Sequence, residues 1–175
     1  MQDKRCILVP VDGSAFSTQI FPDVRKLFPP DENEIVLLRV GQDPEGHVGR
    51  PPRLASAEIG VLSYQSRKDM QDATHPIYAS QERESAVADL ALDLRDEQSI
   101  LENMGYDVTV EIRLDRERGP AIINYVETHD VDAVAMTTHW RTGINKLIFG
   151  SVAQYVAQHT TVPVTMDQMV YHCAM

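Results

Sequence analysis

The chain has 175 residues, 43% of them hydrophobic and 24% charged, which is ordinary for a globular domain with a substantial core, so we expect a single domain over residues 1–175. Its formal net charge of −10 argues against a nucleic acid or an anionic membrane as the main partner. Cys6 and Cys173 lie far apart, and the apolar run near the start is too short for a signal peptide or a membrane span, so we expect a cytoplasmic protein.

The first forty residues predict a strand, a helix and a second strand. Residues 6–11 are a continuous apolar run of buried-strand length. The segment Asp12–Ser14 then breaks the run with residues typical of a turn and a helix cap. Apolar residues at helical spacing follow over 16–28, and Pro29–Pro30 ends that helix. A second apolar run over 35–40 completes a βαβ unit, whose strands should be parallel neighbours.

Residues 41–79 have the least regular pattern. Gly, Pro, Arg and Asp dominate the first half, and a short apolar patch lies over 59–64. We interpret this stretch as a flexible insertion over one edge of the sheet, because long connections inside a compact domain are uncommon. A disordered surface loop is the alternative.

The next part of the chain predicts two helices with a strand between them. From Ser80 to Met104, apolar residues form one helical stripe, and Gly105 marks its end. Residues 108–114 alternate between apolar and polar, which is typical of a strand with one polar face at a sheet edge. Pro120 begins a short helix that continues to His129.

The stretch over residues 131–166 carries the strongest functional signal. An apolar strand over 131–136 is followed by a polar loop, a helix that opens at Gly150–Ser151 and one more short strand. In a parallel sheet this arrangement directs loop amides and a helix N-terminus at one point, which suits a phosphate. Five strands and four helices in alternation predict an α/β fold with a doubly wound, mostly parallel five-stranded sheet and helices on both faces.

The chain resembles the universal stress protein family in two segments. Residues 7–14, Ile-Leu-Val-Pro-Val-Asp-Gly-Ser, are similar to that family's first strand and turn. Residues 130–143, continued by 149–153 and 162–164, are similar to its C-terminal signature. The resemblance covers nearly the whole chain apart from 41–79 and a C-terminal tail, 167–175. It implies the strand order 3-2-1-4-5, with any ligand between the first and fourth strands.

The resemblance also implies a nucleotide site, from which this sequence departs. ATP-binding members carry Gly-x2-Gly-x9-Gly followed by Ser or Thr, and the three glycine positions here are Thr137, Trp140 and Gly150. Glycine lets the backbone approach phosphate oxygens, so the two replacements predict that nucleotide binding is weakened or lost. No cofactor is favoured, with ATP or AMP as the alternative. A retained nucleotide would contact Val11, Asp12, Val40, Met136, Thr137, His139, Trp140, Gly150, Ser151 and Val152.

Several of these residues also have plainer interpretations. For Asp12–Ser14 a helix cap with a turn is favoured, and His139 fits a solvated loop histidine. Our preferred hypothesis for Trp140 is that its indole fills and plugs the phosphate site; a stacking platform is the alternative. Cys6 is most simply a buried small hydrophobe.

The end of the chain predicts self-association. The last strand would leave an unpaired sheet edge without a charged guard. We therefore expect a homodimer through the apolar tail 167–175 and the strand formed by Val162, Pro163, Val164, Thr165 and Met166.

We expect no enzymatic activity. No nucleophile–base pairing stands out from local spacing, and residues 11–14 do not supply the Ser-Gly-Gly-x-Asp-Ser loop of ATP-pyrophosphatases. The favoured function is a non-catalytic stress-response protein that acts as a dimer. The alternative is an ATP- or AMP-binding switch with at most slow hydrolysis.

Overall fold

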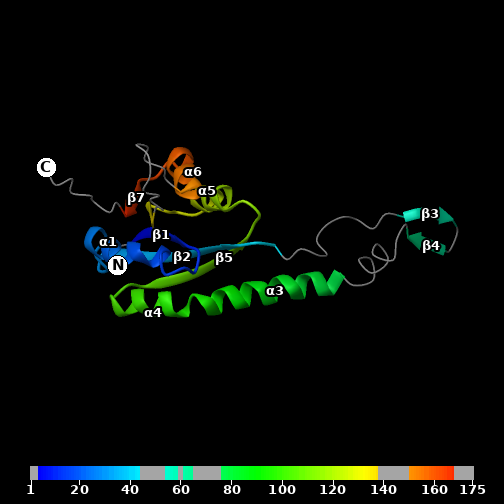
Figure 1. Cartoon of the computed structure of the whole chain (residues 1–175), viewed down its shortest axis with the longest axis horizontal. Coiled ribbons are helices and arrows are strands. Elements are labelled where there is room, and N and C mark those ends of the chain that lie inside the picture. Colours follow the sequence, from blue (N-terminus) through cyan, green and yellow to red (C-terminus); the bar gives the residue numbers. More distant parts are fainter. Residues whose placement is uncertain (1–3, 44–53, 59–60, 65–75, 138–149, 168–175) are drawn as a thin grey trace, which may run out of the picture.

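The computed structural model describes residues 4–43, 54–58, 61–64, 76–137 and 150–167. Its main sheet has five parallel strands in the spatial order β5-β2-β1-β6-β7 (Figure 1). Their bounds are β1 Arg5–Val11, β2 Asn33–Gly41, β5 Val108–Leu114, β6 Ala133–Thr137 and β7 Val164–Asp167. Numbered along the chain, these five strands have the order 3-2-1-4-5. The predicted α/β doubly wound fold is therefore confirmed, with a sheet that is entirely parallel.

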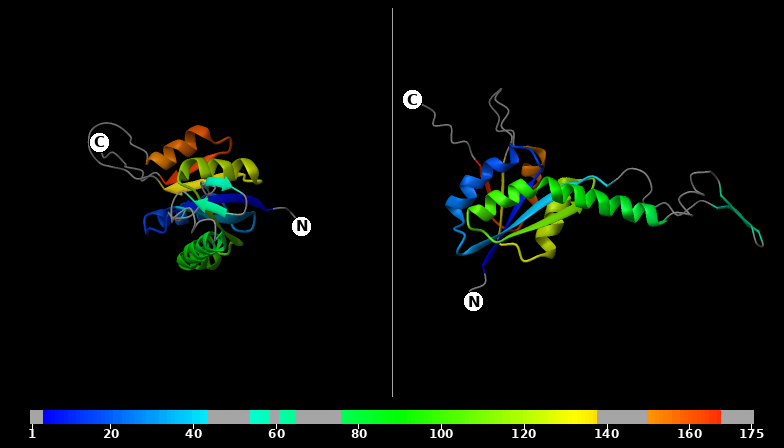
Figure 2. Two further views of the ribbon diagram at one scale, coloured as in Figure 1. Left: turned by 90° about the vertical axis from the view of Figure 1, so that its right-hand side faces the viewer. Right: turned by 90° about the horizontal axis from the view of Figure 1, so that it is seen from below.

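Helices cover both faces of this sheet. The helices are η1 Ser17–Ile20, α1 Phe21–Leu27, α3 Pro76–Asp93, α4 Arg95–Asn103, α5 Arg118–Thr128 and α6 Ser151–His159. Side chains of α5 and α6 pack on one face, and those of α1 and α4 on the other. Figure 2 shows α3 running beneath β5 and beyond the end of the sheet. None of the described helices is both long and apolar enough to cross a membrane.

The central strand β1 is buried on both sides. Leu8 joins the core beneath α5 and α6, whereas Ile7 and Val9 join the core beneath α1 and α4. Because successive side chains of a strand point to opposite faces, a doubly covered strand needs an unbroken apolar run. The run over 6–11 meets this requirement and explains why β1 lies in the middle.

The two neighbours of β1 pair with it over different lengths. β2 pairs along the whole strand, from Arg5 to Val11, but β6 pairs only with Ile7 and Leu8. Pro10 follows shortly after this short ladder, and a proline has no N–H to donate to a neighbouring strand. The carboxyl ends of β1 and β6 therefore part, while β6 continues to pair with β7.

Several predicted boundaries were wrong. The first predicted helix is a 3-10 turn, η1, followed by the short helix α1. The long helix predicted from Ser80 starts at Pro76 and is interrupted at Leu94, where α4 follows α3. The helix predicted to begin at Pro120 starts at Arg118. The last strand starts only at Val164, because the prolyl residue before it has no N–H to pair.

The interval predicted to be a flexible insertion, 41–79, contains regular structure. β3, Leu54–Glu58, and β4, Val61–Tyr64, form an antiparallel pair, and the first turn of α3 also falls within 41–79. The sequence pattern did not predict this strand pair, since β3 has no β-branched residue that would have marked it as a strand. Other residues of the interval lie outside the described part of the chain.

The central strands should dominate stability. We expect Leu37→Ala in β2 to lower the free energy of unfolding by about 2–5 kcal/mol, because it leaves a cavity in the core. Leu37 is 0% exposed, whereas the control, Leu92→Ala in α3, removes a side chain that is 51% exposed. The control should change the free energy by about 0.5 kcal/mol or less. Urea unfolding monitored by circular dichroism measures both, and equal losses would contradict this picture of the core.

Candidate functional site

A cavity of ≈ 240 Å³ lies where β1 and β6 part. Carboxyl ends of β1, β2 and β6 form its floor, and the first turns of α5 and α6 form its rim. This is the topological switch point of the sheet, where ligands bind in open α/β folds. The cavity is lined by Pro10, Val11, Asp12, Phe16, Ser17, Leu38, Val40, Arg118, Ile122, Met136, Thr137, Gly150, Ser151, Val152 and Ala153.

The lining can be compared directly with the residues predicted to contact a nucleotide. Eight of those ten line the cavity: Val11, Asp12, Val40, Met136, Thr137, Gly150, Ser151 and Val152. His139 and Trp140 lie outside the described residues, so the predicted plugging by Trp140 stays a prediction. Sequence reasoning missed Arg118, because the helix was expected to begin only at Pro120. The available signal was the end of β5 at Leu114, which places the next helix start at the carboxyl edge of the sheet.

The segment Asp12–Ser14 forms a tight turn at the mouth of the cavity. The Ser14 amide donates to Asp12 Oδ1 at 3.0 Å, and the Ser14 hydroxyl donates to the same oxygen at 2.6 Å. Gly13 has φ +74°, and a Cβ there would lie 2.5 Å from Nη1 of Arg39. The positive φ therefore favours glycine at this position. The turn is confirmed, and the Ser14 hydroxyl accepts from the amide of Ser17, the first residue of η1, at 3.3 Å.

Asp12 is held in its ionised form. Burial opposes ionisation, but hydrogen bonds from Ser14, with further contributions from Ser17 and the positive charge of Arg39, outweigh it and lower the pKa of the Asp12 carboxyl. Within residues 4–43, 83–137 and 150–166, the buried Nε and Nη1 atoms of Arg39 have no hydrogen-bond partner. Asp12 therefore presents a carboxylate that accepts hydrogen bonds, such as those of ligand hydroxyl groups.

The N-terminus of α6 also lines the cavity. Gly150 is the N-cap residue, and no side chain caps the helix there. The first helical amides, at Ser151 and Val152, border the cavity. Unpaired amides and the helix dipole give this end partial positive charge, which favours an anion. Most of the other lining residues are apolar, and Val40 and Met136 are among the buried ones.

We compared the sequence with models of known protein families. The model of the "Universal stress protein family" matches residues 5–167. The chain belongs to the universal stress protein family. The family that the sequence resembles is thus confirmed, over nearly the whole chain.

The fold of this universal stress protein is similar to several solved structures. Hypothetical protein MJ0577 is 16% identical, with 93% of this chain and 94% of that chain covered at a TM-score of 0.60. Universal stress protein UspA from Lactobacillus plantarum is 18% identical, with coverage of 93% and 96% at a TM-score of 0.58. A universal stress protein in complex with cAMP is 13% identical, with coverage of 93% and 95% at a TM-score of 0.53. No curated protein matches the chain.

Cys6 of this universal stress protein lies at the start of β1, away from the cavity. Burial, followed by the negative charges of Glu34, Asp132 and Asp130, raises the pKa of the Cys6 thiol to about 11. Since the thiolate is the reactive form, Cys6 is unreactive near neutral pH and suits the packing role predicted for it. Among the described residues, no group of three or more His, Cys, Asp or Glu is placed to hold a metal ion.

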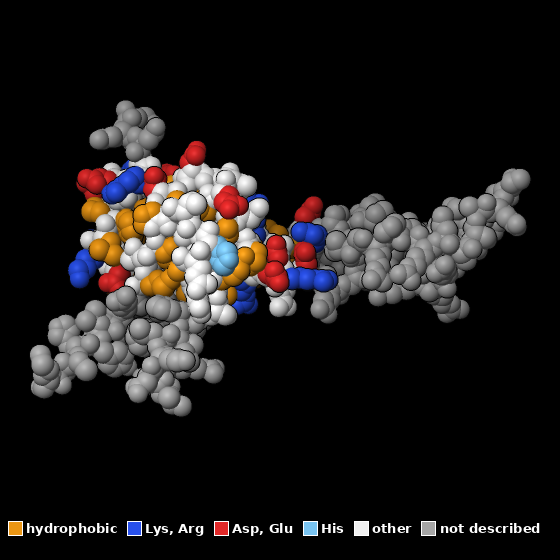
Figure 3. Space-filling view, turned by 90° about the horizontal axis from the view of Figure 1, so that it is seen from above, with side chains coloured by type: hydrophobic (Ala, Val, Ile, Leu, Met, Phe, Trp, Pro, Cys, Tyr) orange, Lys and Arg blue, Asp and Glu red, His pale blue; other side chains and the backbone are white. Residues whose placement is uncertain are grey.

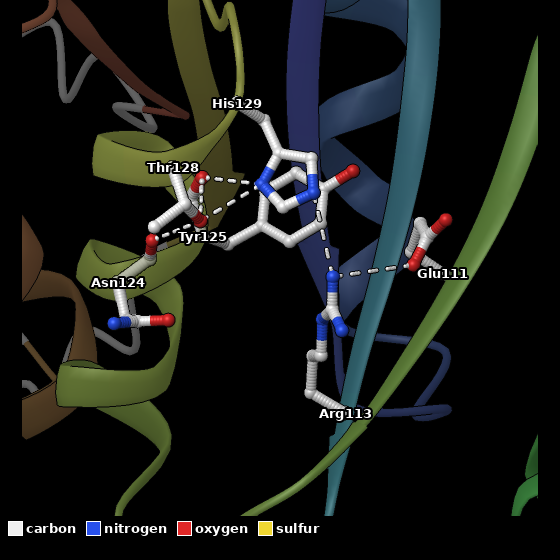
Figure 4. Close-up of polar contacts among 6 residues, drawn as sticks. All are labelled: Glu111, Arg113, Asn124, Tyr125, Thr128 and His129. Carbon is white, nitrogen blue, oxygen red and sulfur yellow. Dashed lines mark hydrogen bonds and ion pairs between the residues drawn. The ribbon is translucent and has the colours of Figure 1, made fainter.

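A polar cluster that sequence reasoning missed links α5 to β5 (Figure 4). The His129 ring stacks on the Tyr125 ring with centroids 3.9 Å apart, and Arg113 lies 5.3 Å from the centroid of Tyr125. His129 Nδ1 lies 3.0 Å from the Tyr125 carbonyl, which only accepts, so Nδ1 carries the proton. Its Nε2 then accepts from Arg113 Nη2 at 3.4 Å. We interpret this cluster as a structural contact, because its ring nitrogens are already paired.

The low pKa of Asp12 makes stability depend on pH. The ionised Asp12 carboxylate stabilises the folded state, and this stabilisation is fully present above the ordinary pKa of 3.8. It is lost as the pH falls through the lowered pKa of the folded state. We therefore expect Asp12→Asn to be less stable than the wild type at about pH 7, with the difference shrinking below about pH 4. Urea unfolding at both pH values measures this. Asp130→Asn is the matched control, and a constant deficit for Asp12→Asn would contradict the assignment.

Proposed function

We propose that this universal stress protein is a non-catalytic regulatory protein that binds an adenine nucleoside monophosphate in the cavity between β1 and β6. The observation that carries the proposal is the combination of three surfaces in the cavity lining, namely the Asp12 carboxylate, apolar side chains and the α6 N-terminus. A carboxylate accepts from ribose hydroxyls, an apolar wall accommodates a base, and helix amides bind phosphate. A nucleotide carries all three of these groups.

A related structure supports the choice of ligand class. The universal stress protein crystallised with cAMP has the same fold, with a TM-score of 0.53. That molecule combines an adenine, a ribose and a single phosphate, which are the three parts that the cavity accommodates here.

A monophosphate is favoured over a triphosphate because of the end of β6. Thr137 is half-buried and lines the cavity where ATP-binding members of the family carry glycine. Its β-branched side chain keeps the backbone away from phosphate oxygens. Together with the hypothesis that Trp140 fills the space beyond, this favours one phosphate at α6 and weakens ATP binding.

We propose that the protein is not catalytic on the basis of the two histidines that the structure describes. His129 and His159 each have Nδ1 next to a helical carbonyl, at 3.0 Å and 2.8 Å respectively, and neither lines the cavity. A general base must reach the proton that it removes, so these two rings are not in position to act on a ligand there.

We expect AMP to raise the melting temperature of the wild-type protein, because a ligand that binds only the folded state stabilises it. Isothermal titration calorimetry should then give a weaker affinity for ATP with magnesium than for AMP. Asp12→Asn should weaken AMP binding by about tenfold through loss of a charge-assisted hydrogen bond.

The matched control for this experiment is Asp130→Asn, which changes an exposed carboxylate outside the cavity and should leave AMP affinity unchanged. Absence of any AMP binding to the wild type would refute the proposed ligand. Hydrolysis of ATP at an appreciable rate would refute the non-catalytic assignment.

We further propose that the protein forms a homodimer through β7. This strand is at one edge of the sheet and pairs only with β6, so its outer N–H and C=O groups lack strand partners among the described residues. Val162, Val164 and Met166 are only partly buried.

The face over α5 and α6 has charges of both signs at its margin and largely hydrophobic and uncharged groups between them (Figure 3). This distribution fits a protein partner better than a nucleic acid.

A charged residue in an edge strand discourages edge-to-edge pairing, so Thr165→Lys should convert the dimer to a monomer. The matched control is Thr109→Lys in β5, at the opposite edge, which should remain dimeric. Sedimentation velocity at about micromolar concentration distinguishes the two states. A monomeric wild type, or dissociation by Thr109→Lys alone, would show that β7 is not the interface.

A further inference from the structure

Arg118 is the cation that borders the cavity. It is the first residue of α5, it is exposed, and it lines the cavity beside Ile122. Within residues 4–43, 83–137 and 150–166, its guanidinium makes no hydrogen bond and no ion pair, in contrast to Arg83, which pairs with Asp43. Arg118 is thus available to a ligand.

Close packing brings Arg118 to the α6 side of the cavity. The next residue, Gly119, lies so near the Tyr155 ring of α6 that a Cβ at Gly119 would be 2.7 Å from Tyr155 Cδ1. Tyr155 is one helical turn from Ser151, at the start of α6. The start of α5 therefore packs against α6 close to its N-terminus, and Arg118 lines the same cavity as the first residues of α6, Ser151 and Val152.

The two charged side chains of the lining are not paired with each other. Asp12 is engaged with Ser14 at one side of the cavity, and Arg118 is at the α5 rim. A ligand that fits both therefore carries hydroxyl donors at one end and a negative charge at the other. Neither a free nucleoside nor inorganic phosphate has both features, whereas a nucleoside phosphate does.

We propose that Arg118 binds the phosphate of the nucleotide in the cavity and so determines the preference for a phosphorylated ligand over the nucleoside. The inference rests on the proposed function of the same cavity. Guanidinium N–H groups bind phosphate oxygens in pairs and stay charged at all physiological pH values. Arg118 thereby supplies from α5 the phosphate contact that glycine supplies after β6 in ATP-binding members, and that Thr137 does not provide.

The test compares AMP with adenosine, which differ only in the phosphate, by isothermal titration calorimetry on the full chain. The wild type should bind AMP more tightly than adenosine. Arg118→Gln should weaken AMP binding by about tenfold and change adenosine binding by less than about twofold, because only the phosphate loses a charge-assisted hydrogen bond. Arg118→Lys, which keeps the charge but not the paired donors, should retain part of the AMP preference.

The matched control is Arg116→Gln, which removes an exposed arginine from the loop before α5. Arg116 does not line the cavity, so this change should leave both affinities unchanged. If the wild type binds neither compound, the proposed function itself is refuted. If the wild type binds both compounds and Arg118→Gln weakens binding of both equally or not at all, only the role of Arg118 is overturned.

Melting curves without ligand show whether each variant is folded. Should Arg118→Gln not fold, the salt dependence of wild-type binding decides, because only an ionic phosphate contact makes AMP binding more salt-sensitive than adenosine binding.

Discussion

The whole site depends on the short ladder between β1 and β6. Parallel strands in a central position normally pair over their full length, yet β6 pairs with β1 only at Ile7 and Leu8. Pro10 has no N–H to extend that ladder, so the two strands part at their carboxyl ends. Their separation opens the cavity and leaves the first turn of α6 facing it. One residue without a backbone hydrogen-bond donor thus contributes to the position of the cavity.

The acidic character of the chain makes its anion site a local feature. A net charge of −10 gives no general attraction for a phosphate, so the attraction must come from groups at the cavity itself. In the function that we propose, the amides of α6 and the guanidinium of Arg118 provide this attraction. Asp12, held ionised by Ser14 and Arg39, also lines the cavity, where it would accept hydrogen bonds from ligand hydroxyl groups. The proposed ligand would be oriented by these two unlike charges.

Sequence reasoning was most successful where one residue pattern has one structural solution. The apolar run of β1 and the alternation over 108–114 both predicted their strands, and the segment opening at Gly150–Ser151 predicted α6. Prediction failed where tertiary contacts decide. β3 lacks the branched residues that mark strands. The continuous apolar stripe is divided into two helices at Leu94, a fully buried residue. For the cavity, strand-end residues were predictable from the resemblance, whereas Arg118 required the contact between α5 and α6.

By resemblance, ATP-binding members of the family carry glycine at two positions where this chain has Thr137 and Trp140, and this difference bears on phosphate binding. Backbone amides of a glycine loop grip several phosphates at once, because small residues let the chain wrap around them. In this chain Thr137 stands at the start of that loop, and the close approach occurs instead between two helices, at Gly119 against Tyr155. A helix contact of this kind positions a single side chain and cannot enclose a chain of phosphates. Recognition by one guanidinium and one helix end would suit one phosphate, and this is the basis of our proposal that the ligand is a monophosphate.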